Sequence, residues 1–593
     1  MKRMMRWLTG WAAVAGVLLF RCATMPEQYV SLDPQAAYAG MASCQPCHQR
    51  IYREYLETGM GRSMHRPDPA RRIERFDAES VVDPKLRLAY HPFWEDGRMF
   101  IREFRLDGAD TVYQRTEQVD YVVGSGHQTR SYLMERNGYL YEMPLTWYVE
   151  AGVWDLSPGY EVQNSRFSRE IGQECMGCHT GKTEFVPGSK HRYREISLGI
   201  DCEKCHGPGQ RHIELMQAGH LVDVGEHIDY SIVNPGKLPA SLQFDVCQQC
   251  HLQGINIPRP GRQVEEYRPA MRLQEVYDVF LEQHADPDAF GIASHAERLQ
   301  QSRCFLESEG RLTCTTCHNP HKQLSRSDTA YYVRRCQSCH RTGHEPLCSA
   351  APELLQAQRG DCVSCHMPAG GTRDIPHVRF HDHRIRVLRS RNPGQAAGFS
   401  LYASAGASAD AQGRAWLAWF EQQEPDPAWL DRAAGLLSPA SADALARVAR
   451  YQGRPQDALR LARQALAANP ADPDLLFLTG ELLEDLRQFQ EAHDCYAAIF
   501  QAHPEAWEAG LKQAVTLLKA RSGDRAALDE ARALLETLRQ MKPFEPRVLQ
   551  NLGFVALNQG RWDEAERLFV EALRYDPDYR QALDNLALIR SRR

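Results

Sequence analysis

The pattern Cys-x-x-Cys-His occurs seven times in this chain of 593 residues and uses fourteen of its 18 cysteines. Random placement of the cysteines and histidines would give about 0.02 such patterns, so composition does not explain the repetition. The cysteines are Cys44, Cys47, Cys175, Cys178, Cys202, Cys205, Cys247, Cys250, Cys314, Cys317, Cys336, Cys339, Cys362 and Cys365. The histidines that follow them are His48, His179, His206, His251, His318, His340 and His366.

This spacing suits covalent haem attachment. Residues i, i+3 and i+4 share one face of a helical turn. Two thiols at i and i+3 can add to the two vinyl groups on one haem edge, and the imidazole at i+4 then points at the iron. Zinc sites, disulfides or redox-active dithiols also use paired cysteines, but none of them requires a histidine after every second cysteine. The motifs therefore predict seven covalently attached haems c, each with a proximal histidine from its own motif.

The other histidines decide whether each iron has a second protein ligand. An iron with two histidines mostly passes electrons, whereas an open iron can carry out chemistry. Fourteen further histidines lie between residues 41 and 390. We expect distal iron ligands at His65, His127, His212, His321, His344, His377 and His383. We expect other roles at His91, His191, His220, His227, His284, His295 and His381. Since His212 and His321 closely follow a motif histidine, each is predicted to bind a neighbouring iron.

Three cysteines in the body of the chain lie outside the motifs. Cys304 and Cys348 belong to the haem region, where they either form a disulfide between the fifth and sixth haems or remain inert thiols. Cys495 is predicted to be part of the core of a repeat helix.

The N-terminus has the features of an export signal. Basic residues precede an apolar run over 7–20, and this run is short for a membrane span but normal for a signal peptide. We expect residues 1–21 to be a signal peptide or an uncleaved anchor that associates with the membrane, and 22–40 to be a linker. Arg21 stands where a lipobox needs a small residue, which disfavours lipidation of Cys22. The protein is therefore predicted to be exported, to the periplasm or the cell surface.

The sequence between 41 and 390 predicts a mainly α and irregular domain with one β-rich insertion. Alternating apolar and polar residues over 80–160 predict a small antiparallel sheet, and Asn137-Gly138 predicts a hairpin within it. The rest of the domain has little continuous apolar pattern, so something other than side chains is expected to fill its core. Residues 391–410 are rich in Gly, Ala and Ser and predict a linker.

The last region, 411–593, repeats. Alanine recurs at 458, 492, 531 and 565, and proline recurs at 470, 504, 543 and 577, in both cases at intervals of 34, 39 and 34. A 34-residue period with an internal small residue and a terminal proline is typical of tetratricopeptide repeats, which form an all-α solenoid. We expect 411–437 to be a divergent first repeat and 578–590 to be a capping helix.

Residues 41–390 resemble multihaem c-type cytochromes of the cytochrome c-552/4-like class. The segments that carry the resemblance are CQPCHQRIYREY, TGMGRSMH, GIDCEKCHGPGQRH, LTCTTCHNPH and CVSCHMPAGG together with IPHVRFHDHRI. With the repeats, the resemblance covers nearly all of 41–593. It implies two histidine ligands at most haems and an exported electron-transfer protein.

These features favour electron transfer between redox partner proteins, with the repeats docking a partner in their inner groove. The repeats could instead form an oligomerisation surface. The alternative function is an oxidoreductase that acts on a small nitrogen or sulfur compound at one open haem, although no Cys-x-x-Cys-Lys variant is present and no residue is assigned as catalytic. A scaffold with structural haems would not need seven redox centres. The net charge is −6 and no segment is strongly basic, so nucleic acid is not an expected partner.

Overall fold

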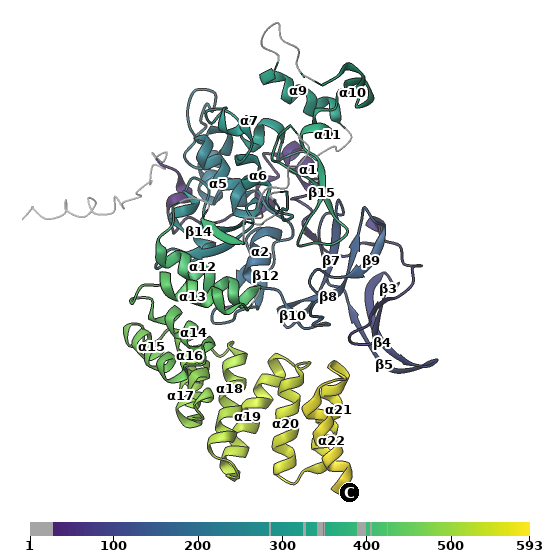
Figure 1. The fold of residues 1–593 in the computed structure, drawn as a ribbon, viewed down its shortest axis with the longest axis vertical. Coiled ribbons are helices and arrows are strands. Elements are labelled where there is room, and N and C mark those ends of the chain that lie inside the picture. The colour runs from purple at the N-terminus through teal and green to yellow at the C-terminus, as the bar shows by residue number, and fades with distance from the viewer. Residues whose placement is uncertain are drawn as a thin grey trace, which may run out of the picture.

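The computed structural model describes residues 28–283, 286, 288–323, 328–340, 348, 350–387, 399–403, 406–423 and 425–592. Figure 1 shows three parts: a cysteine-rich region at the top, a β-rich region at the right and a row of paired helices at the bottom. The predicted signal segment 1–21, Cys22 and the predicted ligand His344 lie outside the described residues.

The β-rich region consists of two antiparallel sheets, whereas the sequence predicted one. The first has the order β1-β6-β7-β8-β10, with β9 also paired to β8, and the second has the order β2-β3-β4-β5. The strands are β1 (Met64–His65), β2 (Val81–Asp83), β3 (Leu88–Glu95), β4 (Arg98–Asp107), β5 (Asp110–Gln118), β6 (Tyr121–Val123), β7 (Thr129–Arg136), β8 (Tyr139–Tyr148), β9 (Val153–Leu156) and β10 (Arg169–Glu170). The flanking strands β1 and β10 join the predicted insertion to the cysteine-rich region on either side of it.

The predicted hairpin at Asn137-Gly138 joins β7 to β8. Both residues have positive φ, 54° and 84°, as a type I′ turn requires. A Cβ atom on Gly138 would lie 2.7 Å from the carbonyl oxygen of Tyr193, so glycine also allows this turn to approach the cysteine-rich region closely.

Short helices and small two- or three-stranded sheets make up the cysteine-rich region. The helices are α1 (Gln49–Leu56), α2 (Gln173–His179), α3 (Glu203–His206), α4 (Gln210–Gln217), α5 (Ala240–His251), α6 (His295–Gln300), α7 (Arg303–Leu306), α8 (Cys314–Cys317), α9 (Thr329–His340), α10 (Pro352–Ala357) and α11 (Cys362–His366). The strands are β11 (Glu184–Phe185), β12 (Tyr193–Glu195), β13 (Ile255–Pro258), β14 (Tyr277–Gln283), β15 (Ala369–Gly371) and β16 (Arg379–His381). This mixture of short helices and long loops agrees with the sparse apolar pattern of the sequence.

Part of the predicted linker 391–410 is a strand. β17 (Ser400–Ala403) pairs antiparallel with β14, and helix α12 begins at Ala409. Phe399 and Leu401 join a core that also contains residues of β13 and α12. The first repeat helices are therefore attached to the cysteine-rich region by a shared sheet and a shared core.

The repeats form a solenoid of paired helices. They are α12 (Ala409–Gln422), α13 (Pro427–Leu436), α14 (Ala442–Tyr451), α15 (Pro455–Ala468), α16 (Pro473–Asp485), α17 (Phe489–Ala502), α18 (Trp507–Ala520), α19 (Arg525–Met541), α20 (Pro546–Asn558), α21 (Trp562–Tyr575) and α22 (Arg580–Arg592). The recurring alanines 458, 492, 531 and 565 are fully buried. A Cβ atom on Gly553 would lie 2.5 Å from the ring of Phe569, which explains why small residues recur where paired helices meet. Cys495 is half-buried against the repeat core, as predicted.

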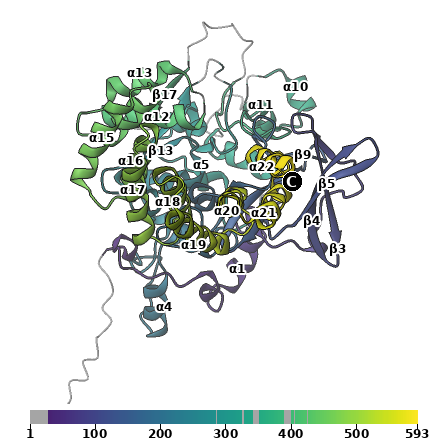
Figure 2. The same cartoon turned by 90° about the horizontal axis from the view of Figure 1, so that it is seen from below.

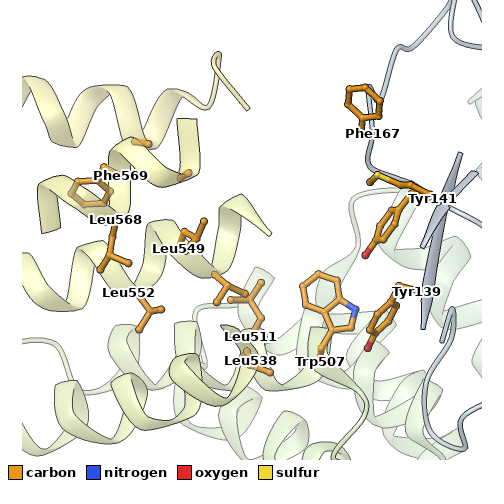
Figure 3. Close-up of a cluster of buried hydrophobic side chains, with 14 of the residues drawn as sticks. Tyr139, Tyr141, Phe167, Trp507, Leu511, Leu538, Leu549, Leu552, Leu568 and Phe569 are labelled. Atoms are coloured by element: carbon orange, nitrogen blue, oxygen red, sulfur yellow. The ribbon is translucent and has the colours of Figure 1, made fainter. Parts of the chain in front are cut away.

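The solenoid packs against the β-rich region. One continuous core contains Tyr139 and Tyr141 of β8 together with Trp507 and Leu511 of α18 (Figure 3), and α21 contacts β5 (Figures 1 and 2). This contact joins segments more than 350 residues apart in the sequence.

Ion pairs follow the edge of that contact. Arg105 lies 2.6 Å from Asp578, and Arg166 lies 2.9 Å from Asp576. The side chain of Lys542 is 1% exposed, and its ammonium group pairs with Glu170. The same ammonium lies 4.1 Å from the ring centroid of Trp507. The solenoid is thus fixed to the β-rich region by buried apolar and charged contacts.

Candidate haem-binding cavity

Each described motif forms a single helical turn. Helices α2, α5, α9 and α11 contain the whole of the second, fourth, sixth and seventh motifs. In the third motif Cys202 directly precedes α3, and in the fifth His318 directly follows α8. The first motif runs from the last residue of a 3-10 helix to the residue before α1. The motif histidine donates its backbone N–H to the carbonyl of the first motif cysteine, at 3.0 Å in the motifs at 44–48, 202–206 and 314–318. The two thiols and the imidazole of a motif therefore share one side of the turn, as covalent haem attachment requires.

A cavity of about 2220 Å³ lies in the middle of the cysteine-rich region. Both cysteines and the histidine of each of the first five motifs line it, together with Cys336 of the sixth. The volume is about twice the upper end of the range for a pocket that holds one small ligand. The side chains of this region thus leave a large space next to the motifs, as expected from the sparse apolar pattern of the sequence.

Thiol contacts link motifs that are far apart in the sequence. A hydrogen bond between Cys44 and Cys202 lowers the pKa of Cys44 and raises that of Cys202, which places the first motif beside the third. Three further thiol contacts link other motifs in the same way. Cys178–Cys250 links the second motif to the fourth, and Cys247–Cys314 links the fourth to the fifth. Cys336–Cys362 links the sixth to the seventh.

Two weaker interactions complete this order. Desolvation and then the neighbouring Cys247 thiol raise the pKa of Cys205 to about 12, which places the third motif beside the fourth. Desolvation and Cys339 raise the pKa of Cys317, which places the fifth beside the sixth. The motifs therefore follow one another in space as first, third, fourth, fifth, sixth and seventh, and the second branches from the fourth.

A first group of imidazoles gathers around the third motif. His206 and His321 lie nearly parallel, with ring centroids 5.8 Å apart and an angle of 11° between the ring planes. His212 is close enough to His48 for that imidazole, after desolvation, to lower the pKa of His212. His321, which follows the fifth motif, therefore lies beside His206 of the third. His212, which follows the third motif, lies beside His48 of the first.

A second group surrounds the fourth and fifth motifs. The ring centroids of His318 and His383 are 6.2 Å apart, and those of His251 and His295 are 5.1 Å apart. Desolvation and then His318 lower the pKa of His383 to about 4. Sequence reasoning selected His383 but not His295, because neither its spacing nor its neighbours in SHAERL set it apart.

Hydrogen bonds fix the orientation of several rings. The Nδ1 atom of His206 lies 2.7 Å from the carbonyl oxygen of Val233, and that of His366 lies 3.0 Å from the carbonyl oxygen of Arg386. A carbonyl oxygen only accepts, so Nδ1 carries the proton and the Nε2 lone pair is free for a metal. These two motif histidines therefore fit an axial role at a haem iron.

The remaining predicted ligands have different surroundings. His127 lines the cavity, and its Nδ1 lies 2.8 Å from the hydroxyl of Ser125. His65 is in β1, outside the cavity lining, with Nδ1 2.9 Å from the carbonyl of Arg66. His377 is also outside the lining.

His377 contacts the β-rich region instead. Its Nε2 lies 2.8 Å from the carboxylate of Asp155 and its ring packs on Tyr148. This contact occupies the Nε2 atom that an iron would need, so the structure does not bring His377 to a motif.

Cys304 and Cys348 both carry free thiols, so the structure does not join them by a disulfide. In the part of the chain that the structure describes, no three His, Cys, Asp or Glu side chains converge as in a metal site built from protein ligands alone. Over the same residues, no helix is both long and apolar enough to traverse a bilayer.

Comparisons with known proteins identify the repeats and give one relative for part of the chain. Residues 444–492, 480–546 and 546–579 match the tetratricopeptide repeat family. The multiheme cytochrome MtrA of Shewanella baltica (strain OS185) is 23% identical over 193 residues, which are 29% of this chain and 54% of that protein. This chain therefore spans about half the length of that relative.

Several solved structures are similar to between a quarter and a third of this chain. MamA from Desulfovibrio magneticus RS-1 is 20% identical, with a TM-score of 0.24, over 26% of this chain and 85% of its own. A thermophilic TPR protein in Thermus thermophilus is 23% identical, with a TM-score of 0.23, over 26% and 82%. YrrB, a TPR protein with an unusual peptide-binding site, is 20% identical, with a TM-score of 0.25, over 30% and 89%. On the family match, residues 444–579 are tetratricopeptide repeats, as the 34-residue period predicted.

Proposed function

We propose that this protein is an exported heptahaem c-type cytochrome that passes electrons between redox partner proteins, with its tetratricopeptide repeats docking a partner. The single observation that carries the proposal is the 2220 Å³ cavity lined by the complete first five motifs. Its wall presents cysteines in pairs, each with a histidine on the same turn. A cavity with this wall fits several haems better than one substrate.

The order of the motifs supports a conducting role. A bound haem supplies an iron that alternates between the ferrous and ferric states. The protein determines how close such centres lie, and the thiols of neighbouring motifs interact along the whole order from first to seventh. Attachment sites this near one another keep neighbouring centres close together. The weak similarity to a multiheme cytochrome is consistent with this proposal.

The second imidazoles also favour electron transfer. His321, His212 and His383 each lie beside the histidine of another motif. Irons with two histidine ligands have no open position for a substrate and mainly pass electrons. We therefore infer mostly bis-histidine haems, and the basic residues followed by the apolar run over 7–20 support a location in the periplasm or at the cell surface.

The repeats offer a surface for a protein partner. Gly553 of α20 packs against Phe569 of α21. Phe554 is the next residue of the same helix, so the Phe554 side chain points roughly 100° away from the contact between the two helices. It is 40% exposed, and Leu588 of α22 is 38% exposed. Exposed apolar side chains on repeat helices suit the binding of a partner peptide or helix.

Mass spectrometry of the full-length protein, matured in a host with c-type haem assembly, tests the first part of the proposal. We expect the mass of seven haems on the chain and predominantly low-spin signals in electron paramagnetic resonance. A bare chain would overturn the haem assignment. A strong high-spin signal that responds to small ligands would overturn the conducting role and favour an enzyme.

The docking role needs a separate test. Phe554→Asp should abolish binding of the redox partner in a co-purification experiment while all haem spectra stay unchanged. Leu106→Asp, at an exposed position on β4, is the matched control and should leave binding intact. Equal binding by the two variants would overturn docking through the repeats.

A further inference from the structure

His295 has a place in the structure that its sequence did not predict. It is the first residue of α6 and its ring lines the cavity. Its ring centroid lies 5.1 Å from that of His251 and 4.7 Å from that of His383. His295 therefore lies between His251 of the fourth motif and His383, whose ring is near His318 of the fifth motif.

The surroundings of His295 are those of an interior group. Desolvation lowers its pKa well below the ordinary value, and the neighbouring imidazoles of His383 and His251 lower it further. The ring of Phe380 packs against it edge-on, with centroids 5.3 Å apart. The rings of His251, His383 and Phe380 thus all lie against His295.

A buried ion pair holds this arrangement in place. The guanidinium of Arg298, one turn after His295, donates to both carboxylate oxygens of Asp382, at 2.8 and 2.5 Å. The two side chains are only 5% and 3% exposed. Because Asp382 directly precedes His383, this bidentate pair fixes the α6 backbone against the segment that carries His383.

The same carboxylate is close to a second guanidinium. Arg386 lies 3.6 Å from Asp382 and 2.6 Å from Asp288. The carbonyl oxygen of Arg386 accepts the hydrogen bond from His366 of the seventh motif. The buried network thus reaches histidines associated with the fourth, fifth and seventh motifs.

We propose that His295 would join His251 in holding the iron of the haem attached at Cys247 and Cys250, and that the Arg298–Asp382 pair positions His295 together with His383. This inference rests on the proposed haem attachment. It assigns to the fourth motif a ligand that lies 44 residues further along the chain. It also assigns His383, together with His318, as a ligand of the haem of the fifth motif.

The ligand assignment is tested with His295→Ala in the full-length, matured protein. We expect seven haems by mass, as in the wild type, with one low-spin signal converted to a high-spin signal. Added imidazole should restore the low-spin signal by filling the open position. His295→Met should keep that iron six-coordinate but raise one midpoint potential, since a methionine ligand raises the potential of a haem.

The matched control is His220→Ala, because His220 is exposed and does not line the cavity. This control should leave every signal unchanged. Seven low-spin haems and unshifted potentials in both His295 variants would overturn the ligand assignment. A wild-type chain without haem would instead overturn the proposed function, so the two failures are distinguishable.

The positioning role is tested with Asp382→Asn and Asp382→Glu. Asparagine should retain seven haems but shift or broaden the low-spin g values of two of them, and glutamate should restore the wild-type values. Asp278→Asn is the control, because Asp278 is also buried and pairs with Arg259 at 2.8 Å on the β13–β14 hairpin. If Asp382→Asn only lowers the melting temperature, as this control should, Asp382 has no positioning role.

Discussion

The imidazoles of His206 and His321 lie almost parallel, with their ring centroids 5.8 Å apart, although His206 belongs to the third motif and His321 follows the fifth. The Nδ1 proton of His206 is engaged by the carbonyl of Val233, so its Nε2 is the nitrogen free for a metal. In the proposed cytochrome these two imidazoles would together hold one haem iron. Such a pair would tie two distant parts of the chain together through one haem.

A double variant tests this pairing. His206→Met and His321→Met should each change the signal of one haem, and the double variant should still change only one, because both ligands belong to the same iron. The midpoint potential of that haem should rise in each case. Electron paramagnetic resonance and a redox titration on the three proteins measure this. Two altered haems in the double variant would show that the rings serve different irons.

His377→Asn should leave all haem signals unchanged, contrary to the expectation from sequence. His377 pairs with Asp155 at 2.8 Å and does not line the cavity. Asparagine is chosen because residue 377 has a φ of 57°, which asparagine tolerates better than most residues. The exposed pair contributes roughly 0.2–1 kcal/mol, so the melting temperature should fall only slightly. A new high-spin signal in this variant would restore His377 as a ligand.

Asp245 should make stability depend on pH. Burial raises the pKa of its carboxyl group from 3.8 to about 6. Because the folded value exceeds the unfolded one, the folded state binds more protons in this range, and the free energy of unfolding falls as pH rises from about 4 to 6. Because asparagine does not titrate, Asp245→Asn removes this fall in the free energy of unfolding. Thermal melts should show a gain in melting temperature that is larger at pH 7 than at pH 4.

A gain of equal size at both pH values would mean that the charge of Asp245 is not the cause. Asp278→Asn is unsuitable as a control here, since burial also raises the pKa of Asp278. Asp33→Asn, at an exposed position, should show no such difference between the two pH values.

Local periodicity was enough to predict the helical repeats. The buried alanines at 458 and 565 and the close packing of Gly553 on Phe569 follow from a fixed 34-residue unit. The hairpin at Asn137-Gly138 was equally local, since two positive φ angles determine which residues fit. Such features depend only on residues near one another in the sequence.

Long-range pairings were harder to predict. The sequence indicated that His321 binds an iron other than its own, but not that His206 would be its neighbour. His295 carries no motif, and only the fold brings it to His251. His377 stands in a histidine-rich segment beside His381 and His383, yet its ring turns to Asp155 in the other region. No sequence pattern reports which of several nearby histidines faces a motif.

Lys542→Ala should loosen the solenoid from the β-rich region. The Lys542 side chain is 1% exposed, and its ammonium pairs with Glu170 and lies over the ring of Trp507. Removing one partner of a buried pair leaves the other charge uncompensated and costs about 3–5 kcal/mol. The double variant Lys542→Met with Glu170→Gln should regain part of this loss, because neither side chain is then charged. The midpoint of chemical denaturation measures this loss of stability.

The matched control for this contact is Lys190→Ala, since Lys190 pairs with Asp474 of the solenoid but the two side chains are 64% and 77% exposed. An exposed pair contributes at most about 1 kcal/mol. If both single variants unfold at the same denaturant concentration, the buried pair does not hold the regions together. If Lys542→Ala also changes the haem spectra, the solenoid contact reaches the second motif along the chain, since Glu170 lies five residues before Cys175.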